Sequence, residues 1–233
     1  MYHYVDDKNF LSNMRRLSGE IMQDLCHIIK EKYDIGTNFR LVGSGAKNFI
    51  MQNGFGSIDL DYNLEIVRCK DFKDCRYLKE CVRKAFDESL KSRNLGNCKD
   101  STSVLTSKSI RFYQSVWSNG IEPRLDSGFY SGNRTACFSI DVCIIRRDRR
   151  NNYYRLIHKK NGWACDDEYY WNIAPNSSKI DKKVDCIKKR GKWELVKQQY
   201  SMIKNKYLSI NNEKNHPSFI CYVEAVNNVY NSI

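Results

Sequence analysis

The apolar residues of this chain recur with two different periods along its length. Apolar positions every three or four residues predict helices over residues 8–32, 74–90, 180–208 and 218–230, with a break near Gly191 in the third. Asp6 or Asp7 is expected to cap the first helix, and Pro217 to open the last. After about residue 175 the pattern is helical only.

Strict alternation of apolar and polar residues predicts strands between the helices. The clearest cover residues 57–67 and 134–146, and shorter ones are expected at 38–42, 104–114 and 153–158. We expect a short helix at 46–52 and a turn-rich loop over 119–133. These elements predict an α+β fold: a small mixed β-sheet with helices on one side and a helical C-terminal region. The expected domains are residues 1–175 and 176–233.

Composition and charge narrow the class of protein. The 233 residues include 39 Lys and Arg against 27 Asp and Glu, a net charge of +12, which favours nucleic acid, nucleotides or other polyanions as partners. Basic runs over residues 146–160 and 182–197 fit either phosphate-contacting surfaces or solvated faces. No apolar run approaches the ~20 residues of a membrane span, and no signal-peptide pattern opens the chain, so a cytoplasmic protein is expected. The ten cysteines and four histidines lack zinc-site spacing.

Three aspartates carry the candidate chemistry. Asp59 and Asp61 alternate with apolar residues, so they share one face of the predicted strand 57–67. This face is either the solvated side of an edge strand or part of a site. Asp141 lies in the middle of the most hydrophobic strand, where an unpaired carboxylate is unfavourable unless a cation compensates. If the two strands are neighbours, the three carboxylates converge, and their oxygens suit Mg²⁺ or Mn²⁺.

A Gly-Ser-Gly sequence precedes these aspartates. Gly43 and Ser44 follow the predicted strand 38–42, at a strand-to-helix turn whose backbone N–H groups and hydroxyl could hold a phosphate. A plain turn explains the same residues without chemistry. Lys47 either adds positive charge at this turn or is a solvated helix residue.

The segments LVGSG, SIDLDYNL and FSIDVCII together resemble the motifs of the polymerase-β-like nucleotidyltransferase superfamily. The similarity covers roughly residues 38–145. It implies that Asp59 and Asp61 bind two metal ions, Mg²⁺ or Mn²⁺, and that Asp141 shares the catalytic one. It also implies that Gly43 and Ser44 hold the β and γ phosphates of a nucleoside triphosphate, with Lys47 nearby and ATP the expected nucleotide.

The reaction implied by this resemblance is transfer of a nucleoside monophosphate to a hydroxyl group. The acceptor stays open between RNA, another nucleotide, a protein side chain and a small molecule, and the positive charge tilts the choice toward a polyanion. Two alternatives use the same fold. One is a module that binds a nucleotide or RNA without turnover, and the other is a toxin–antitoxin component.

Overall fold

The structure is a computed structural model that describes residues 1–114, 121–125, 136–174, 178–212 and 216–233. The chain forms two compact units. The larger comprises Val5–Ile50 and Phe55–Ala174, and the smaller comprises Met1–Tyr4, Met51–Gly54 and Pro175–Ile233. The smaller unit thus takes in two short segments from the region expected to form the core. All of the candidate site residues lie in the larger unit.

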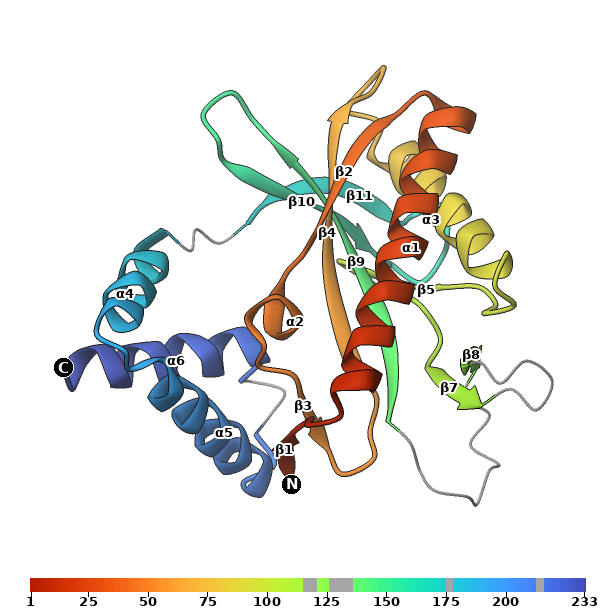
Figure 1. The fold of residues 1–233 in the computed structure, drawn as a ribbon. Helices are drawn as coiled ribbons and strands as arrows, with labels where there is room; N and C mark the ends of the chain where they lie inside the picture. Colours follow the sequence, from red (N-terminus) through yellow and green to blue (C-terminus); the bar gives the residue numbers. More distant parts are fainter. Residues whose placement is uncertain (115–120, 126–135, 175–177, 213–215) are drawn as a thin grey trace. The chain divides into compact units, whose positions relative to one another are not determined.

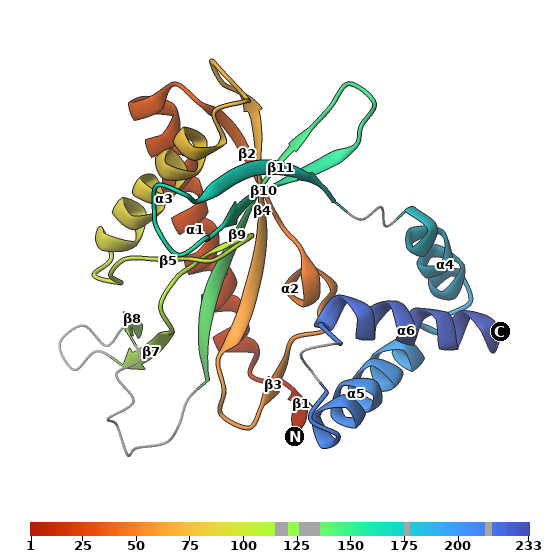
Figure 2. The same ribbon diagram turned by 180° about the vertical axis from the view of Figure 1, so that it is seen from behind.

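A mixed β-sheet is the frame of the larger unit (Figures 1 and 2). Its main strands follow the order β11-β10-β9-β4-β2, and β4 and β9 run parallel while the other neighbours are antiparallel. These strands are β2 (Gly36–Leu41), β4 (Ile58–Arg68), β9 (Cys137–Arg147), β10 (Tyr153–Lys159) and β11 (Glu168–Ile173). Four short strands join it through β9: β5 (Lys99–Asp100), β6 (Leu105–Thr106), β7 (Ile110–Gln114) and β8 (Ile121–Leu125).

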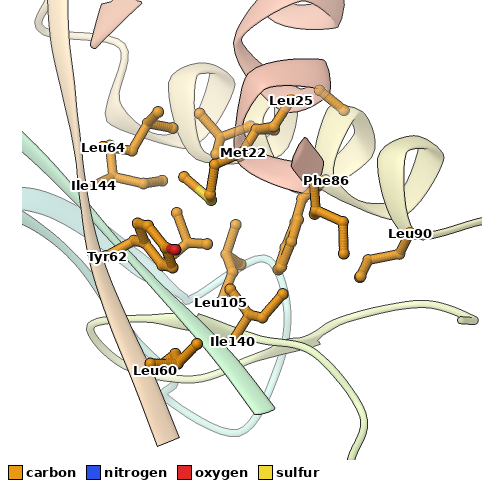
Figure 3. Packing of buried hydrophobic residues seen from close by; sticks show 14 of the residues in the cluster. Met22, Leu25, Leu60, Tyr62, Leu64, Phe86, Leu90, Leu105, Ile140 and Ile144 are labelled. Carbon is orange, nitrogen blue, oxygen red and sulfur yellow. The ribbon is translucent and has the colours of Figure 1, made fainter. Parts of the chain in front are cut away.

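Two helices cover one face of this sheet. They are α1 (Lys8–Tyr33), capped by the Asp7 side chain, and α3 (Cys75–Lys91), capped by Asp74. Figure 3 shows apolar side chains of both helices meeting those of the strands, among them Met22, Phe86 and Ile140. Burying each such side chain stabilises the fold by about 1.5–3 kcal/mol. The predicted mixed sheet with helices on one side is confirmed.

The alternation in β4 decides which side chains face away from this core. Leu60, Tyr62 and Leu64 are buried against the helices, whereas Asp59 is exposed and Asp61 is half-buried. Because successive side chains of a strand point to opposite faces, the two aspartates lie on the face that α1 and α3 leave uncovered.

The smaller unit contains three helices and a two-stranded sheet. The helices are α4 (Ser178–Lys189), α5 (Trp193–Ser209) and α6 (Ser218–Asn231), and the antiparallel strands are β1 (Tyr2–Tyr4) and β3 (Met51–Asn53). The expected break is confirmed at Gly191, whose φ is +65°. Within α6, Cys221 and Ala225 are buried, whereas Phe219 is 48% exposed. No helix in the described part of the chain is long and apolar enough to cross a membrane.

Several expected elements are corrected by the structure. The helix expected at 46–52 is α2, Gly43–Lys47, and Asn48 ends it in the left-handed conformation with φ at 57°. The strand expected over 104–114 is interrupted and forms β6 and β7. Within the loop expected over 119–133, Ile121–Leu125 is β8, paired with β7, and the other residues of that range lie outside the described residues. Strands β1, β3, β5 and β11 were not predicted.

A buried network of charges fixes α3 to the sheet. Lys79 is only 1% exposed, and its Nζ lies 2.8 Å from Asp100 Oδ1 in β5. The second oxygen of Asp100 lies 2.7 Å from Nδ1 of His158, whose Nε2 lies 2.7 Å from Asp167. Burial lowers the pKa of Lys79, and the hydrogen bond and charge of Asp100 oppose that effect.

Replacing Lys79 by Met tests this network. The substitution leaves the buried Asp100 carboxylate without its cation, so we expect the free energy of unfolding to fall by about 3 kcal/mol. Lys84→Met on the same helix, at an exposed position, is the matched control and should change it by less than about 0.5 kcal/mol. Urea unfolding followed by circular dichroism measures both. Equal effects of the two substitutions would contradict a role for the network in stability.

Candidate active site

The parallel pairing of β4 with β9 sets the positions of the candidate carboxylates. In this register Asp61 is opposite Asp141, and Asp59 is opposite Ser139. Since opposite residues of neighbouring strands point to the same face, all three aspartates share the face left uncovered by α1 and α3. The two strands of the sequence motifs are therefore neighbours, and the three acidic residues are brought together at the centre of the sheet.

The electrostatics of Asp61 reflect this crowding. Its pKa is raised from 3.8 to about 6, first by burial and then by the negative charges of Asp141 and Asp59. The positive charge of Lys47 opposes this rise. A carboxylate that resists ionisation in this way gains free energy when a cation binds beside it.

Asp141 also has a raised pKa. Burial is the chief cause and the charge of Asp59 adds to it, while the Thr106 hydroxyl lowers the pKa. Its Oδ1 atom is buried and has no hydrogen-bond partner among the described residues. A buried carboxylate oxygen without a partner is unfavourable, and a cation or a substrate hydroxyl would satisfy it.

Asp59 differs from the other two aspartates. Its side chain is exposed, and its Oδ1 accepts a hydrogen bond of 2.7 Å from the Ser139 hydroxyl on β9. Its Oδ2 receives no hydrogen bond from the described residues. One oxygen of this carboxylate is thus fixed by the protein, and the other is left for a ligand.

Helix α2 brings the glycine turn directly against Asp61. Gly43 has a φ of +63°, and a Cβ at this position would lie 2.4 Å from Asp61 Oδ2. The backbone N–H of Val42 donates to the carbonyl of Asp61 over 2.8 Å. Gly45 is constrained by space alone, since a Cβ there would lie 2.8 Å from the Leu60 side chain. Glycine is therefore required at 43 by both backbone conformation and space.

The other predicted phosphate-binding residues follow in the same helix. Ser44 and Lys47 are both half-buried, and Lys47 is close enough to Asp61 to lower its pKa. The first N–H groups of a helix have no partner within it, so the start of α2 presents donors beside the carboxylates. The structure thus places Gly43 and Lys47 beside Asp61, with Ser44 between them in the chain.

Sequence reasoning missed two residues of this face. The alternation of β9 puts Ser139 on the same strand face as Asp141, but its contact with Asp59 follows only from the strand register. Arg155 of β10 is opposite Ile145 and so lies on the carboxylate face. Its Nε is buried without a hydrogen-bond partner in the described residues, and its charge lowers the pKa of Cys143. The alternation of β9 and β10 was the available signal for both.

The donor atoms fit a hard divalent cation that arrives with a phosphate ligand. Carboxylate oxygens without nearby imidazole or thiolate ligands suit Mg²⁺ or Mn²⁺. Within the described residues, no three His, Cys, Asp or Glu side chains form a group that holds a metal ion by themselves. Mg²⁺ is characteristically bound by one or two carboxylates together with substrate phosphates, and the unpartnered Asp141 Oδ1 is consistent with such a site.

Comparison with solved structures identifies the fold. The chain is similar to Vibrio cholerae DncV in its 3′-deoxy ATP bound form, with a TM-score of 0.52 and 11% identity over 86% of this chain and 61% of that one. DncV cyclic AMP-GMP synthase with the linear intermediate 5′ pppA(3′,5′)pG gives a TM-score of 0.51 and 10% identity over 80% and 57%. The chain has the nucleotidyltransferase fold.

The similar proteins are longer than the part of them that this chain matches. This chain spans about three fifths of the length of DncV in its complex with nonhydrolyzable GTP, at a TM-score of 0.52 and 12% identity. No protein-family model matches the sequence, and comparison with curated proteins gives no match.

The raised pKa of Asp61 predicts how stability depends on pH. The folded state holds a proton on Asp61 up to about pH 6, whereas the unfolded chain releases it near 3.8, so stability falls as pH rises through that window. Asp61→Asn removes this penalty. At about 1.4 kcal/mol per tenfold change in proton affinity, we expect the variant to be more stable at pH 7.5 by about 2–3 kcal/mol, with the difference vanishing toward pH 4.

Urea unfolding of both proteins in EDTA from pH 4 to 8 measures this difference. Asp166→Asn, at an exposed position, is the matched control and should show no such pH dependence. A stability difference for Asp61→Asn that stays constant across this range would show that the Asp61 carboxylate is not strained by its surroundings.

Proposed function

We propose that this protein transfers a nucleoside monophosphate from a metal-bound nucleoside triphosphate to a hydroxyl acceptor. The observation that carries the proposal is the register of β4 and β9, which sets Asp61 opposite Asp141 beside the glycine turn at Gly43. The similarity to DncV structures that hold nucleotides supports it, since those proteins share the fold.

The acidic residues and the glycine turn have different parts in the proposed reaction. Asp59, Asp61 and Asp141 would hold Mg²⁺ or Mn²⁺, which supplies charge stabilisation for the triphosphate and acidifies the acceptor hydroxyl. The start of α2, with Gly43 and Ser44, would hold the β and γ phosphates.

The reaction is a substitution at the α-phosphorus. The acceptor oxygen forms a bond to this phosphorus as the bond to the pyrophosphate oxygen breaks, and the pyrophosphate leaves with the electron pair. Asp141 is the residue proposed to take the proton of the hydroxyl, because its Oδ1 has no hydrogen-bond partner among the described residues and burial raises its pKa.

The acceptor is the least constrained part of the proposal. RNA, a nucleotide, a protein and a small molecule all present hydroxyl groups. A second nucleotide comes first among them, because a similar structure holds a linear dinucleotide with its triphosphate intact.

A turnover assay with labelled nucleotides tests the proposed activity. Each of the four α-labelled nucleoside triphosphates, singly and in pairs, is incubated with Mg²⁺ or Mn²⁺, with and without RNA. We expect metal-dependent pyrophosphate release, and the labelled product identifies the acceptor class. Asp59→Asn/Asp61→Asn should reduce turnover roughly a thousandfold by removing charge stabilisation.

A matched double variant controls for the loss of two charges. Asp166→Asn/Asp185→Asn changes the net charge equally at exposed positions and should keep full turnover. Nucleotide binding without turnover under any condition would favour the non-catalytic binding module instead.

The glycine turn gives a second test. Gly43→Ala places a methyl group against the Asp61 carboxylate, so we expect kcat/KM to fall about a hundredfold through displacement of that carboxylate. Gly191→Ala is matched in backbone conformation, with φ at +65° against +63°, but its Cβ would meet no atom within 4 Å. It should lose about 1 kcal/mol of stability and no activity. Equal kcat/KM for the two variants would argue against contact between the turn and the site.

A further inference from the structure

Among the described residues of β9, Ser139 is the one whose side chain donates a hydrogen bond to a candidate metal-binding carboxylate, that of Asp59. It donates to Asp59 Oδ1 over 2.7 Å, and Ser139 itself is 6% exposed. Ser139 lies on β9 directly opposite Asp59 in the parallel register, so the pairing of the two strands keeps these side chains adjacent. This contact is therefore part of the sheet rather than a surface hydrogen bond.

Asp59 needs such a restraint more than its neighbours do. Asp61 is confined by burial and by the close approach of Gly43, and Asp141 is confined by burial within β9. Asp59 is exposed, so without the hydroxyl its carboxylate would be free to rotate about χ2. Ordering a side chain before a ligand binds reduces the entropy that binding must offset.

The hydrogen bond also limits how Asp59 can bind a cation. With Oδ1 engaged by Ser139, only Oδ2 is left with its full acceptor capacity, which favours coordination through one oxygen. Mg²⁺ and Mn²⁺ accept single carboxylate oxygens in octahedral geometry, whereas Ca²⁺ takes 6–8 oxygen ligands and often both oxygens of a carboxylate. A fixed single-oxygen ligand therefore suits Mg²⁺ and Mn²⁺ better than the two-oxygen coordination that Ca²⁺ often adopts.

We propose that Ser139 is a positioning residue that holds Asp59 as a single-oxygen ligand and so sets the preference of the site for Mg²⁺ and Mn²⁺ over Ca²⁺. The inference rests on the proposed function, because it concerns the metal that would accompany the nucleoside triphosphate. Beyond the proposed function, the inference assigns a role to a residue outside the acidic motif and gives a physical reason for metal selectivity.

Metal binding measured without turnover tests the role of Ser139. Mn²⁺ is titrated by electron paramagnetic resonance in the presence of nonhydrolysable ATP and GTP analogues, and Ca²⁺ is then added as a competitor. Partners of metal ligands typically contribute 10–100-fold to affinity. We expect Ser139→Ala to bind Mn²⁺ about tenfold more weakly than the wild-type protein. In the competition, Ca²⁺ should displace Mn²⁺ from this variant at a Ca²⁺ to Mn²⁺ ratio about tenfold lower than for the wild-type protein. Ser139→Thr, which keeps the hydroxyl, should restore both values.

Two further variants separate positioning from a general loss of stability. Ser89→Ala removes a hydrogen bond of 2.8 Å from a serine that is fully buried in α3, so it should lower stability without changing Mn²⁺ affinity. Ser139→Cys keeps the shape of the serine with a weaker donor and should reproduce the Ser139→Ala phenotype even if the alanine variant folds poorly.

The outcomes distinguish this inference from the proposed function. Wild-type Mn²⁺ affinity and Ca²⁺ competition in both Ser139→Ala and Ser139→Cys, with binding lost in Asp59→Asn, would overturn the positioning role and leave the proposed function intact. Failure of the wild-type protein to bind Mn²⁺ with either analogue would overturn the proposed function and this inference together.

Discussion

The parallel pairing of β4 with β9 is the constraint on which the rest of the site depends. These strands are separated in sequence by α3 and four short strands, yet their register sets Asp61 opposite Asp141 and Asp59 opposite Ser139. Their other faces supply the apolar side chains that α1 and α3 cover. A shift of one residue would turn the aspartates into the core and the leucines outward, so burial of the core and assembly of the site are enforced by the same register.

This arrangement concentrates negative charge where the protein provides little to neutralise it. The pKa of Asp61 rises to about 6, and that of Asp141 is raised as well. Elsewhere the same unit holds a carboxylate beside basic side chains, since Lys79 and His158 both contact Asp100. The fold can therefore pair buried charge, and the contrast supports the proposal that Asp61 and Asp141 bind a cation that arrives with its own phosphate ligand.

Much of this organisation follows from local patterns in the sequence. The periodicity of α1, its cap at Asp7, and the alternation in β4 and β9 are visible in the chain itself, because each depends on neighbouring residues. The extent of α2 could not be predicted from local patterns. Its end depends on Asn48 adopting a left-handed conformation, and the residues that follow, Met51–Asn53, pair with the N-terminal strand β1. Strand β11 also depends on a partner, since it pairs with β10 along its length.

Within the site, too, some features follow from neighbouring residues and others only from the pairing of distant strands. The acidic residues could be found from sequence because their chemistry is conspicuous in apolar strands. Ser139 could not be assigned to Asp59, because a serine on a strand face is ordinary until the register of two distant strands is known. Gly43 is intermediate: its position in a turn suggests conformational freedom, but only the structure shows that the Asp61 carboxylate occupies the space of a Cβ. The candidate acidic residues are thus readable from composition and spacing, whereas the groups that fix their geometry emerge only from the pairing of the strands.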